Sequence, residues 1–443
     1  MPGRGRTGGQ ASAKPPAAPR RYFGTPPQMP DNPGNAAPPC LTAQTPGTGG
    51  AIRVLEEDFE VEEIPLYEAC GAGEHLYLTV RKKGVSTHAV ISELAGKLGK
   101  RPADVGYAGL KDARSVALQR LSVEHVSEEK VRDIRLHGAE VVKVERHGNK
   151  LKPGHLAGNR FRIVIRGARP GTRSTAQEVL DVLAGRGVPN WFGEQRFGKY
   201  ASNHLAGKAL IAGDAAAFAA AIMTPPGWEE VSDESRAARE AFAAGRYASA
   251  AELLPRFMRG EARIVAELAR SGSSERALRA LNPRLAFFYM SAWQSHVFNR
   301  VLVKRGVERM DELMAGDLAY IHAKGAVFEV KDAQAEAARA KAFEISPSGP
   351  LWGSKSPVAG GTAGEMEREA LAEEGLGTAV WDSRRVKRLT GGRRPFRVPI
   401  LLHTPAEEPE PGTLVLRFSL PAGAYATNVL REVTKSTPGG VDE

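Results

Sequence analysis

The chain has 443 residues, 42% of them hydrophobic and 25% charged, which predicts two or three globular domains and excludes collagen, coiled coil and wholesale disorder. Its formal net charge of +10 fits a polyanionic partner, although many proteins with neutral partners carry a similar charge. No run of about 18 apolar residues occurs, so we expect no membrane-spanning helix.

Residues 1–50 differ in composition from the rest of the chain. They are rich in proline and glycine and carry five Lys or Arg residues against a single acid. Such a segment cannot bury an apolar core, so we expect a disordered basic tail, either passive or weakly attracted to RNA. It has no apolar stretch of signal-peptide length, and the low cysteine count of the chain fits a reducing compartment. We therefore expect a cytoplasmic protein.

The next segment carries clear periodic patterns. Apolar residues alternate over 75–81, which predicts a half-buried strand. An apolar residue then recurs at every fourth position, which predicts a helix that is capped by Ser86 or Thr87 and ends at Gly99.

A second strand is predicted over 159–166, where arginine and apolar residues alternate. Phe161 lies on the apolar face, and Arg160, Arg162 and Arg166 share the other. That basic face is either the solvated outside of a sheet or a surface for phosphates, and the pattern favours neither.

Beyond residue 200 the chain becomes rich in Ala, Glu and Arg, which predicts short helices. A longer helix is predicted over 286–305, with an apolar stripe that runs from Phe287 through Trp293. Three of its polar positions are expected to be exposed: Gln294, Asn299 and Arg300.

Strand patterns return near the C-terminus, over 397–402 and 413–420. The sequence therefore predicts an α+β core in two parts, residues 51–196 and 370–443, interrupted by a largely helical inserted segment, residues 197–369. We expect the inserted segment to form one wall of a cleft, with a stabilising cap as the alternative.

The segment VGYAGLKDAR at 105–114 is the first candidate for chemistry. Its two glycines permit a tight turn and the close approach of a ligand. Asp112 follows them, with Lys111 and Arg114 as cationic neighbours. An ionised, positioned aspartate can act as a nucleophile or a base, and the alternative is a surface turn with a local salt bridge.

Three further segments are candidates for RNA contact or for structure. NWFGEQRFG at 190–198 is either an organised loop or a structural ion pair in an aromatic cluster. Residues 420–432 predict a strand, a glycine turn and a helix, with Tyr425 placed to stack on a base or to pack into the core. The segment 384–397 has seven Lys or Arg residues and no acid, so we expect phosphate contacts there rather than a solvated loop. The basic positions chosen are Arg384, Arg385, Arg393 and Arg394.

Signatures of metal and cofactor sites are absent from the sequence. The ten histidines form no HxxxH or HExxH, and no CxxC pair occurs. GAGEH at 71–75 lacks the third glycine of a dinucleotide loop, and no phosphate-binding GxxxxGK[ST] is present. We expect neither a metal nor a cofactor.

Several of these segments together resemble the TruD family of tRNA pseudouridine synthases. The matching motifs, in order, are EEDFEVEEIP, GAGEH, GYAGLKDARSVALQRLSV, GNRF, NWFGEQRFG, SAWQSHVFN and LPAGAYATNVLRE, which span about residues 50–443. The resemblance implies a pseudouridine-synthase core with a mixed β-sheet flanked by helices, plus an inserted, largely helical α/β domain. It implies isomerisation of uridine to pseudouridine in tRNA, at position 13 of the D-arm, with no cofactor. No protein partner is implied.

The resemblance also assigns roles to individual residues. The catalytic aspartate of the family falls on Asp112. Substrate-binding positions of the family fall on Arg53, Phe59, Asn159, Phe161 and Tyr425. The family usually has Phe at the position of Tyr425 and often Lys at that of Arg53. Neither change removes the role, because Tyr still stacks and Arg still pairs with a carboxylate.

The implied reaction breaks the bond from N1 of uracil to the sugar, turns the base and rejoins it through C5. Asp112 would either attack the anomeric carbon or remove the neighbouring sugar proton, and both routes stay open. Two alternatives use the same fold: a noncatalytic RNA-binding protein, and an RNA glycosidase that releases the base.

Overall fold

The computed structural model describes residues 38–230, 234–376, 380–381, 383 and 386–436. The largest sheet has ten strands. These are β1 (Gly49–Ile52), β2 (Phe59–Pro65), β3 (His75–Lys83), β4 (Gly106–Tyr107), β5 (Val116–Glu124), β6 (Ala139–His147), β7 (Leu156–Ala168), β14 (Leu401–Leu402), β15 (Glu407–Glu410) and β16 (Thr413–Pro421).

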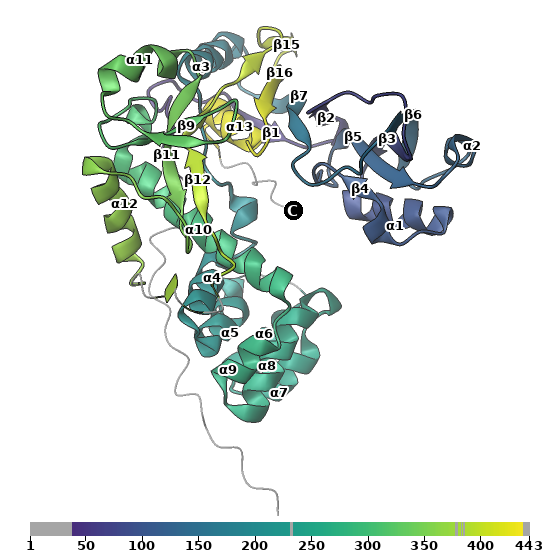
Figure 1. Cartoon of the computed structure of the whole chain (residues 1–443), viewed down its shortest axis with the longest axis vertical. Coiled ribbons are helices and arrows are strands. Elements are labelled where there is room, and N and C mark those ends of the chain that lie inside the picture. The colour runs from purple at the N-terminus through teal and green to yellow at the C-terminus, as the bar shows by residue number, and fades with distance from the viewer. Residues whose placement is uncertain (1–37, 231–233, 377–379, 382, 384–385, 437–443) are drawn as a thin grey trace, which may run out of the picture.

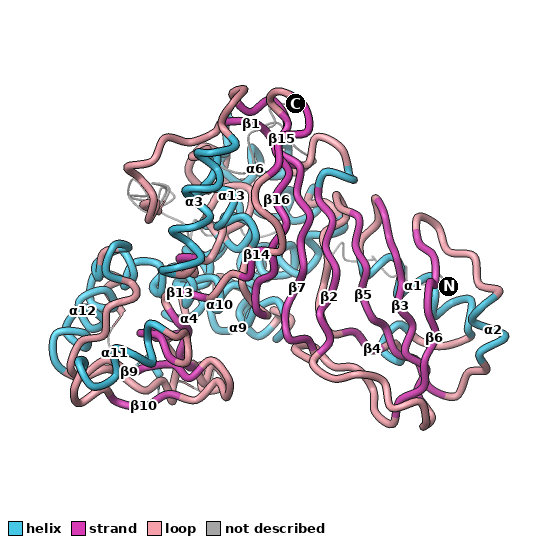
Figure 2. The backbone as a smooth tube through the Cα atoms, turned by 90° about the horizontal axis from the view of Figure 1, so that it is seen from above, coloured by secondary structure: helices cyan, strands magenta, loops and turns pink. Residues whose placement is uncertain are grey.

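The main path of this sheet runs β14-β16-β7-β2-β5-β3-β6 (Figure 2). Within the described residues, β2 pairs with β5 in parallel and the other neighbours are antiparallel. The sheet is therefore mixed, as expected. The inward face predicted over 75–81 is confirmed, because Leu76, Leu78 and Val80 of β3 are fully buried. The alternation fails at Tyr77, which lies on the other face and is only 2% exposed.

Helices flank the sheet at both ends of this path. α1 (Thr87–Leu98) and α2 (Glu128–Arg132) pack at the β3–β6 end, and α3 (Arg173–Arg186) and α13 (Ala426–Thr434) pack at the β7–β16 end (Figure 2). α1 begins and ends as predicted. The Ser86 hydroxyl accepts a hydrogen bond from the Ala89 N–H at 3.2 Å, and Gly99 closes the helix with a φ of 68°.

The largely helical character expected beyond residue 200 is present. Its helices are α4 (Asn203–Ala212), α5 (Ala215–Met223), α6 (Arg236–Ala243), α7 (Tyr247–Leu253), α8 (Arg259–Ser271), α9 (Ser274–Arg279) and α10 (Pro283–Arg305). In Figure 1, α6–α9 gather at the opposite end of the molecule from α3 and α11 (Ala333–Lys341). α10 contains the helix predicted over 286–305 and connects these regions.

The apolar stripe predicted on α10 is buried from Met290 onward, with Trp293 at 0% exposure. It was wrong at Phe287, which is 51% exposed. The packing of α4 explains the difference: a Cβ on Gly207 would lie 2.1 Å from the carbonyl oxygen of Tyr289. The close approach of α4 therefore covers α10 from this turn and leaves Phe287 uncovered.

A second, four-stranded sheet lies beside α10. Its order is β10 (Val327–Glu329), β9 (Leu318–Ile321), β11 (Ile345–Leu351) and β12 (Gly392–Pro395), with α12 (Gly361–Glu373) close by (Figure 1). β13 (Arg397–Val398) follows β12 in the chain and pairs with β8 (Val188–Pro189) to form a short two-stranded sheet. The boundary expected at residue 369 falls inside α12, and β12 pairs with β11. We therefore propose that the inserted segment extends to about Pro395.

The polar positions chosen on α10 are less exposed than the sequence suggested. Gln294 is only 7% exposed, because its Nε2 donates to the carbonyl oxygen of Trp352 at 2.6 Å. Asn299 is half-buried and holds the backbone N–H and carbonyl of Phe192, each at 3.0 Å. Arg300 pairs with α12. Replacing these residues would therefore disturb packing as well as a surface.

The expected tail overlaps the described structure at residues 38–50. β1 pairs with β7, and the N–H groups of Leu41 and Thr42 donate to the Glu432 carboxylate at 2.8 and 3.0 Å. Glu432 on α13 is fully buried, so it needs these donors. The prediction of disorder was therefore wrong for 38–50, and residues 1–37 lie outside the described part. No helix among the described residues is long and apolar enough to cross a membrane.

Candidate active site

The loop between β4 and β5 carries Asp112. Its carboxylate accepts a hydrogen bond from Nη2 of Arg53 at 2.7 Å, and its side chain is 46% exposed. The cation that meets Asp112 is thus Arg53, a position to which the family resemblance assigned pairing with a carboxylate. The neighbouring Lys111 does not meet Asp112: its Nζ points away and pairs with the buried Glu63 at 2.6 Å. Arg114 is exposed.

Buried hydrogen-bond donors hold the backbone of the Asp112 loop in place. Nζ of Lys82 donates to the carbonyl oxygen of Asp112 at 2.5 Å, and the Ser115 hydroxyl donates to the same oxygen at 2.8 Å. The Thr87 hydroxyl accepts the Lys111 N–H at 2.9 Å. Burial lowers the pKa of Lys82 to about 8, and the nearby negative charge of Asp112 opposes this shift. These contacts fix the loop backbone and leave the carboxylate free to face a substrate.

Arg53 is held by an aromatic ring and by an unusual backbone conformation. Its guanidinium lies 4.3 Å from the ring centre of Phe59, the first residue of β2. Its φ is 58°, in the left-handed region that a non-glycine residue rarely occupies. Such strain is concentrated at functional sites, and here it turns the side chain toward Asp112.

Three phenylalanines from neighbouring strands form a row beneath Arg53. Phe59 meets Phe161 edge-to-face at 6.0 Å, and Phe161 packs on Phe418 of β16 at 5.4 Å. All three are buried. Phe161 therefore has little ring surface left for a substrate.

Asn159 lies in β7 between Glu63 of β2 and Leu420 of β16. Its Oδ1 is buried and has no hydrogen-bond partner among the described residues. Gly158 before it is required by close packing, since a Cβ there would lie 2.3 Å from the Leu420 carbonyl oxygen. An unpaired buried acceptor is costly, so Asn159 is suited to a ligand that brings a donor.

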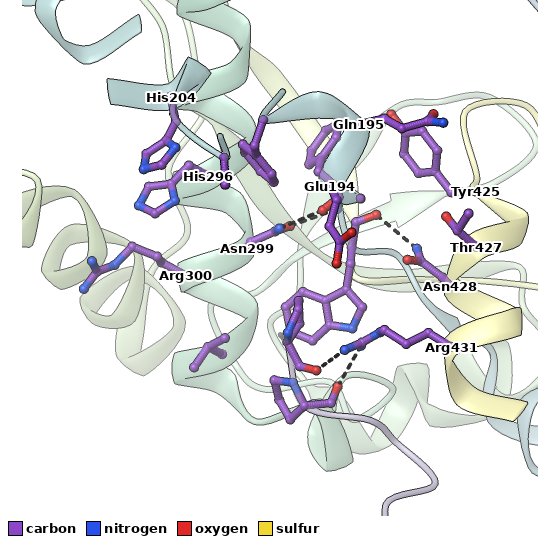
Figure 3. Close-up of a pocket in the computed structure, with 18 of the residues that line it drawn as sticks. Glu194, Gln195, His204, His296, Asn299, Arg300, Tyr425, Thr427, Asn428 and Arg431 are labelled. Carbon is purple, nitrogen blue, oxygen red and sulfur yellow. Dashed lines mark hydrogen bonds between the residues drawn. The ribbon is translucent and has the colours of Figure 1, made fainter. Parts of the chain in front are cut away.

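A cavity of about 560 Å³ opens beside Arg53. One side is the start of α13 and the other is formed by α4 and α10, so the inserted segment does contribute a wall (Figure 3). In Figure 3, Tyr425 and Asn428 face Asn299 and His296 around Glu194. Pockets of 300–1,000 Å³ are typical of ligand sites. The loop predicted at 190–198 is thus organised, with Phe192, Glu194 and Gln195 in the lining.

Tyr425 is placed by its neighbours at the edge of this cavity. It is the N-cap residue of α13, and its ring lies 6.4 Å from Phe192. The Arg394 guanidinium lies 4.2 Å from the Phe192 ring and 5.8 Å from that of Tyr425. It also donates to the Gly423 carbonyl at 3.1 Å, two residues before Tyr425. Burial lowers the pKa of Arg394 to about 10, which leaves it charged at neutral pH.

Two of the four basic positions chosen in the segment 384–397, Arg393 and Arg394, are not free to form the phosphate surface that the sequence suggested. Arg393 is only 2% exposed, because it pairs with the equally buried Glu367 of α12 at 2.7 Å. Phe396 is 1% exposed and belongs to the core. Arg394 contacts the rings of Phe192 and Tyr425, which line the cavity. The remaining two positions, Arg384 and Arg385, lie outside the described residues.

The arginine face of β7 is the outer face of the sheet. Each arginine pairs with an acid near or within β2, at 2.7–3.0 Å. The pairs are Arg160–Glu62, Arg162–Glu60 and Arg166–Asp58. Because each of these arginines is neutralised by an acid, this face of the sheet does not favour the binding of phosphate groups.

Sequence reasoning missed two polar residues that support the loop. Glu63 continues the buried alternation of Phe59 and Val61, and Lys82 continues that of β3. A charged residue at an inward position of a strand is rarely buried unless it is paired. That signal was present in the sequence and would have identified both. Within the described residues, no three His, Cys, Asp or Glu side chains are grouped to hold a metal ion.

Comparisons with known proteins agree with this architecture. The sequence profile of the tRNA pseudouridine synthase D (TruD) family matches residues 38–433. A tRNA pseudouridine synthase D of Geobacter metallireducens is 47% identical over 397 residues, covering 89% of this chain and 97% of the relative. That of Thermus thermophilus is 36% identical over 399 residues, covering 90% and 92%. A solved structure from Methanosarcina mazei, described as a candidate tRNA pseudouridine synthase D, is 27% identical, with a TM-score of 0.74 over 90% of this chain and 96% of that one.

The mixed sheet, together with these matches, defines a pseudouridine synthase, which is a class of isomerase. The aspartate loop and the inserted helices are parts of one continuous match from residue 38 to residue 433. Within that class, the chain belongs to the tRNA pseudouridine synthase D (TruD) family.

Proposed function

We propose that the protein isomerises uridine to pseudouridine in tRNA, at position 13 of the D-arm, with Asp112 as its catalytic carboxylate. The observation that carries the catalytic assignment is the ion pair between Asp112 and Arg53, because Arg53 lines the cavity. Position 13 rests on the family resemblance alone. A cytoplasmic location is part of the same proposal.

The reaction balances without an added reactant. The N1–C1′ bond of uridine breaks, the uracil turns, and a C5–C1′ bond forms while the proton leaves C5 and N1 gains a proton. Asp112 either attacks C1′ or removes the C2′ proton, and its half-exposed carboxylate is accessible for both. The Arg53 guanidinium supplies positive charge beside the carboxylate.

The detached uracil has to be retained while it turns. We assign this role to Tyr425, because its ring lines the cavity, whereas Phe161 is 6% exposed and packed on Phe418. Phe161 then supports Phe59 from below. Asn159 would accept the imide N–H of uracil through its unpaired Oδ1, which is closed to solvent in this structure, so its side chain has to turn to make the contact. The target base must leave its stack to enter, at a cost of a few kcal/mol.

The test is to incubate the purified protein with an unmodified tRNA transcript and to map pseudouridine by position. The proposal expects one pseudouridine, at position 13, and no free uracil. Free uracil would support the RNA glycosidase, and binding without any product would support the noncatalytic RNA-binding protein. Pseudouridine at another position would overturn the assignment of position 13.

A further inference from the structure

A second surface with the chemistry of RNA binding lies at the tip of the inserted segment. It is formed where the short helix Arg256–Met258, α8 and α10 begin. We call it the tip patch, and its members are Arg256, Phe257, Arg259, Arg263, Arg284, Phe287 and Phe288.

Contacts between α8 and α10 bring these residues together. A Cβ on Gly260 would lie 2.4 Å from Cδ2 of Leu285, so the two helices touch at their first turns. The Tyr289 hydroxyl donates to the Glu261 carboxylate at 2.7 Å and ties the same turns together. In Figure 1 this region lies among α6–α8, apart from the large sheet.

The aromatic part of the tip patch is unusually exposed. Phe257 is 76% exposed, Phe287 51% and Phe288 40%. Single exposed apolar residues are common, whereas adjoining ones mark interaction sites. Phe287 and Phe288 lie three and four residues beyond Arg284, so helical spacing places them on the same side of α10 as that arginine.

The charges of the tip patch are unmatched. All four arginines are exposed, and none has an ion-pair partner within the described residues. Some other arginines of the inserted segment are matched, since Arg236 pairs with Glu240 and Arg270 with Glu267. The N-termini of α8 and α10 add the positive ends of two helix dipoles.

We propose that the tip patch binds unstacked nucleotides of the RNA substrate, away from the catalytic loop. Its phenylalanines would stack on bases and its arginines would contact phosphates, which is how proteins hold single-stranded or looped RNA. The identification of the RNA as tRNA rests on the proposed function. A protein partner is the less favoured occupant, because four like charges without a paired acid match a polyanion better than a mixed protein surface.

The test compares two variants of the full chain. R256Q/R259Q/R263Q/R284Q removes the charges of the tip patch. R236Q/R270Q is the matched control, and Arg270 lies roughly 16 Å from Arg259 along the axis of α8. Affinity for tRNA is measured against salt concentration, and circular dichroism verifies that both variants fold.

Each phosphate contact contributes about 0.7–0.9 to the slope of log affinity against log salt. The tip-patch variant should therefore lower that slope by about 3, and the control should leave it unchanged. F257A/F287A should weaken tRNA binding about fivefold or more, since stacking contributes about 1–3 kcal/mol per base.

Unchanged slope and affinity in the tip-patch variants would overturn the proposal. So would a change in oligomeric state with unchanged RNA affinity, because it would assign the patch to self-association. A wild-type protein that binds tRNA but forms no pseudouridine would overturn the proposed function. The tRNA affinities of the wild-type and tip-patch variants would still show whether the tip patch binds RNA.

Discussion

The buried pair Lys111–Glu63 is the structural anchor of the catalytic loop, and breaking it should cost stability. Lys111 is 7% exposed and Glu63 3%, with 2.6 Å between Nζ and Oε1. Lys111→Met removes the cation and leaves a buried carboxylate that still accepts the Arg120 N–H at 2.8 Å. Breaking a buried pair from one side costs about 3–5 kcal/mol, and the remaining hydrogen bond places the expected loss near 3 kcal/mol.

The double variant E63Q/K111M shows how much of the lost stability comes from the unpaired charge that K111M leaves on Glu63. The amide oxygen that replaces the Glu63 carboxylate can still accept the Arg120 N–H, and no unpaired charge remains. We expect the double variant to recover most of the lost stability, because neutral replacement of a buried pair is often harmless. Urea unfolding followed by tryptophan fluorescence measures both, and single-turnover rates show whether the loop is still positioned.

A loss below about 1 kcal/mol in K111M would refute this account of the loop. So would additive losses in the double variant, since additivity would mean that the two side chains act independently. A stable K111M with a slowed reaction would show that Lys111 acts on the substrate instead of positioning the loop.

Three further predictions concern the residues around Asp112. Asn159→Ala should lower kcat/KM about tenfold or more in a pseudouridine assay with little change in the urea midpoint, because its Oδ1 has no partner in the described structure. Tyr425→Phe should keep activity within a few-fold, whereas Tyr425→Ala should lose about 5- to 150-fold, the value of one stacked base; equal rates for both would remove the stacking role. The pKa of Lys82 is lowered from 10.5 to about 8 in the folded state. Between these pH values the folded protein therefore binds fewer protons than the unfolded chain. The free energy of unfolding should rise with pH across that window, by roughly 3 kcal/mol at most. Urea unfolding at pH 8 and pH 10 measures this rise, and a rise that persists unchanged in Lys82→Met would show that other groups cause it.

Local periodicity was sufficient to predict the elements that form around the site. Leu76, Leu78 and Val80 alternate within β3, and α1 has its cap and its closing glycine in the sequence. Asp112 and Tyr425 were placed at a loop and at a helix start for the same reason. In each case the determining residues lie within a few positions of one another.

Long-range partners were beyond the reach of such patterns. The ordering of residues 38–50 depends on Glu432, some 390 residues away. The burial of Arg393 depends on Glu367 of α12, so its run of basic neighbours gave the wrong environment. Likewise, Oδ1 of Asn159 becomes a buried acceptor without a partner only when β2, β7 and β16 lie side by side. Only the tertiary structure brings these groups together.

The central claim is that the Asp112 carboxylate performs the chemistry, and Asp112→Asn tests it most directly. The variant should fold, because a pair with a half-exposed carboxylate contributes at most about 1 kcal/mol. In a single-turnover assay on tRNA, with pseudouridine mapped by position, we expect the rate to fall at least about 100-fold while tRNA affinity stays nearly unchanged. A variant that forms pseudouridine at the wild-type rate would contradict the account, because the catalytic group would then lie elsewhere.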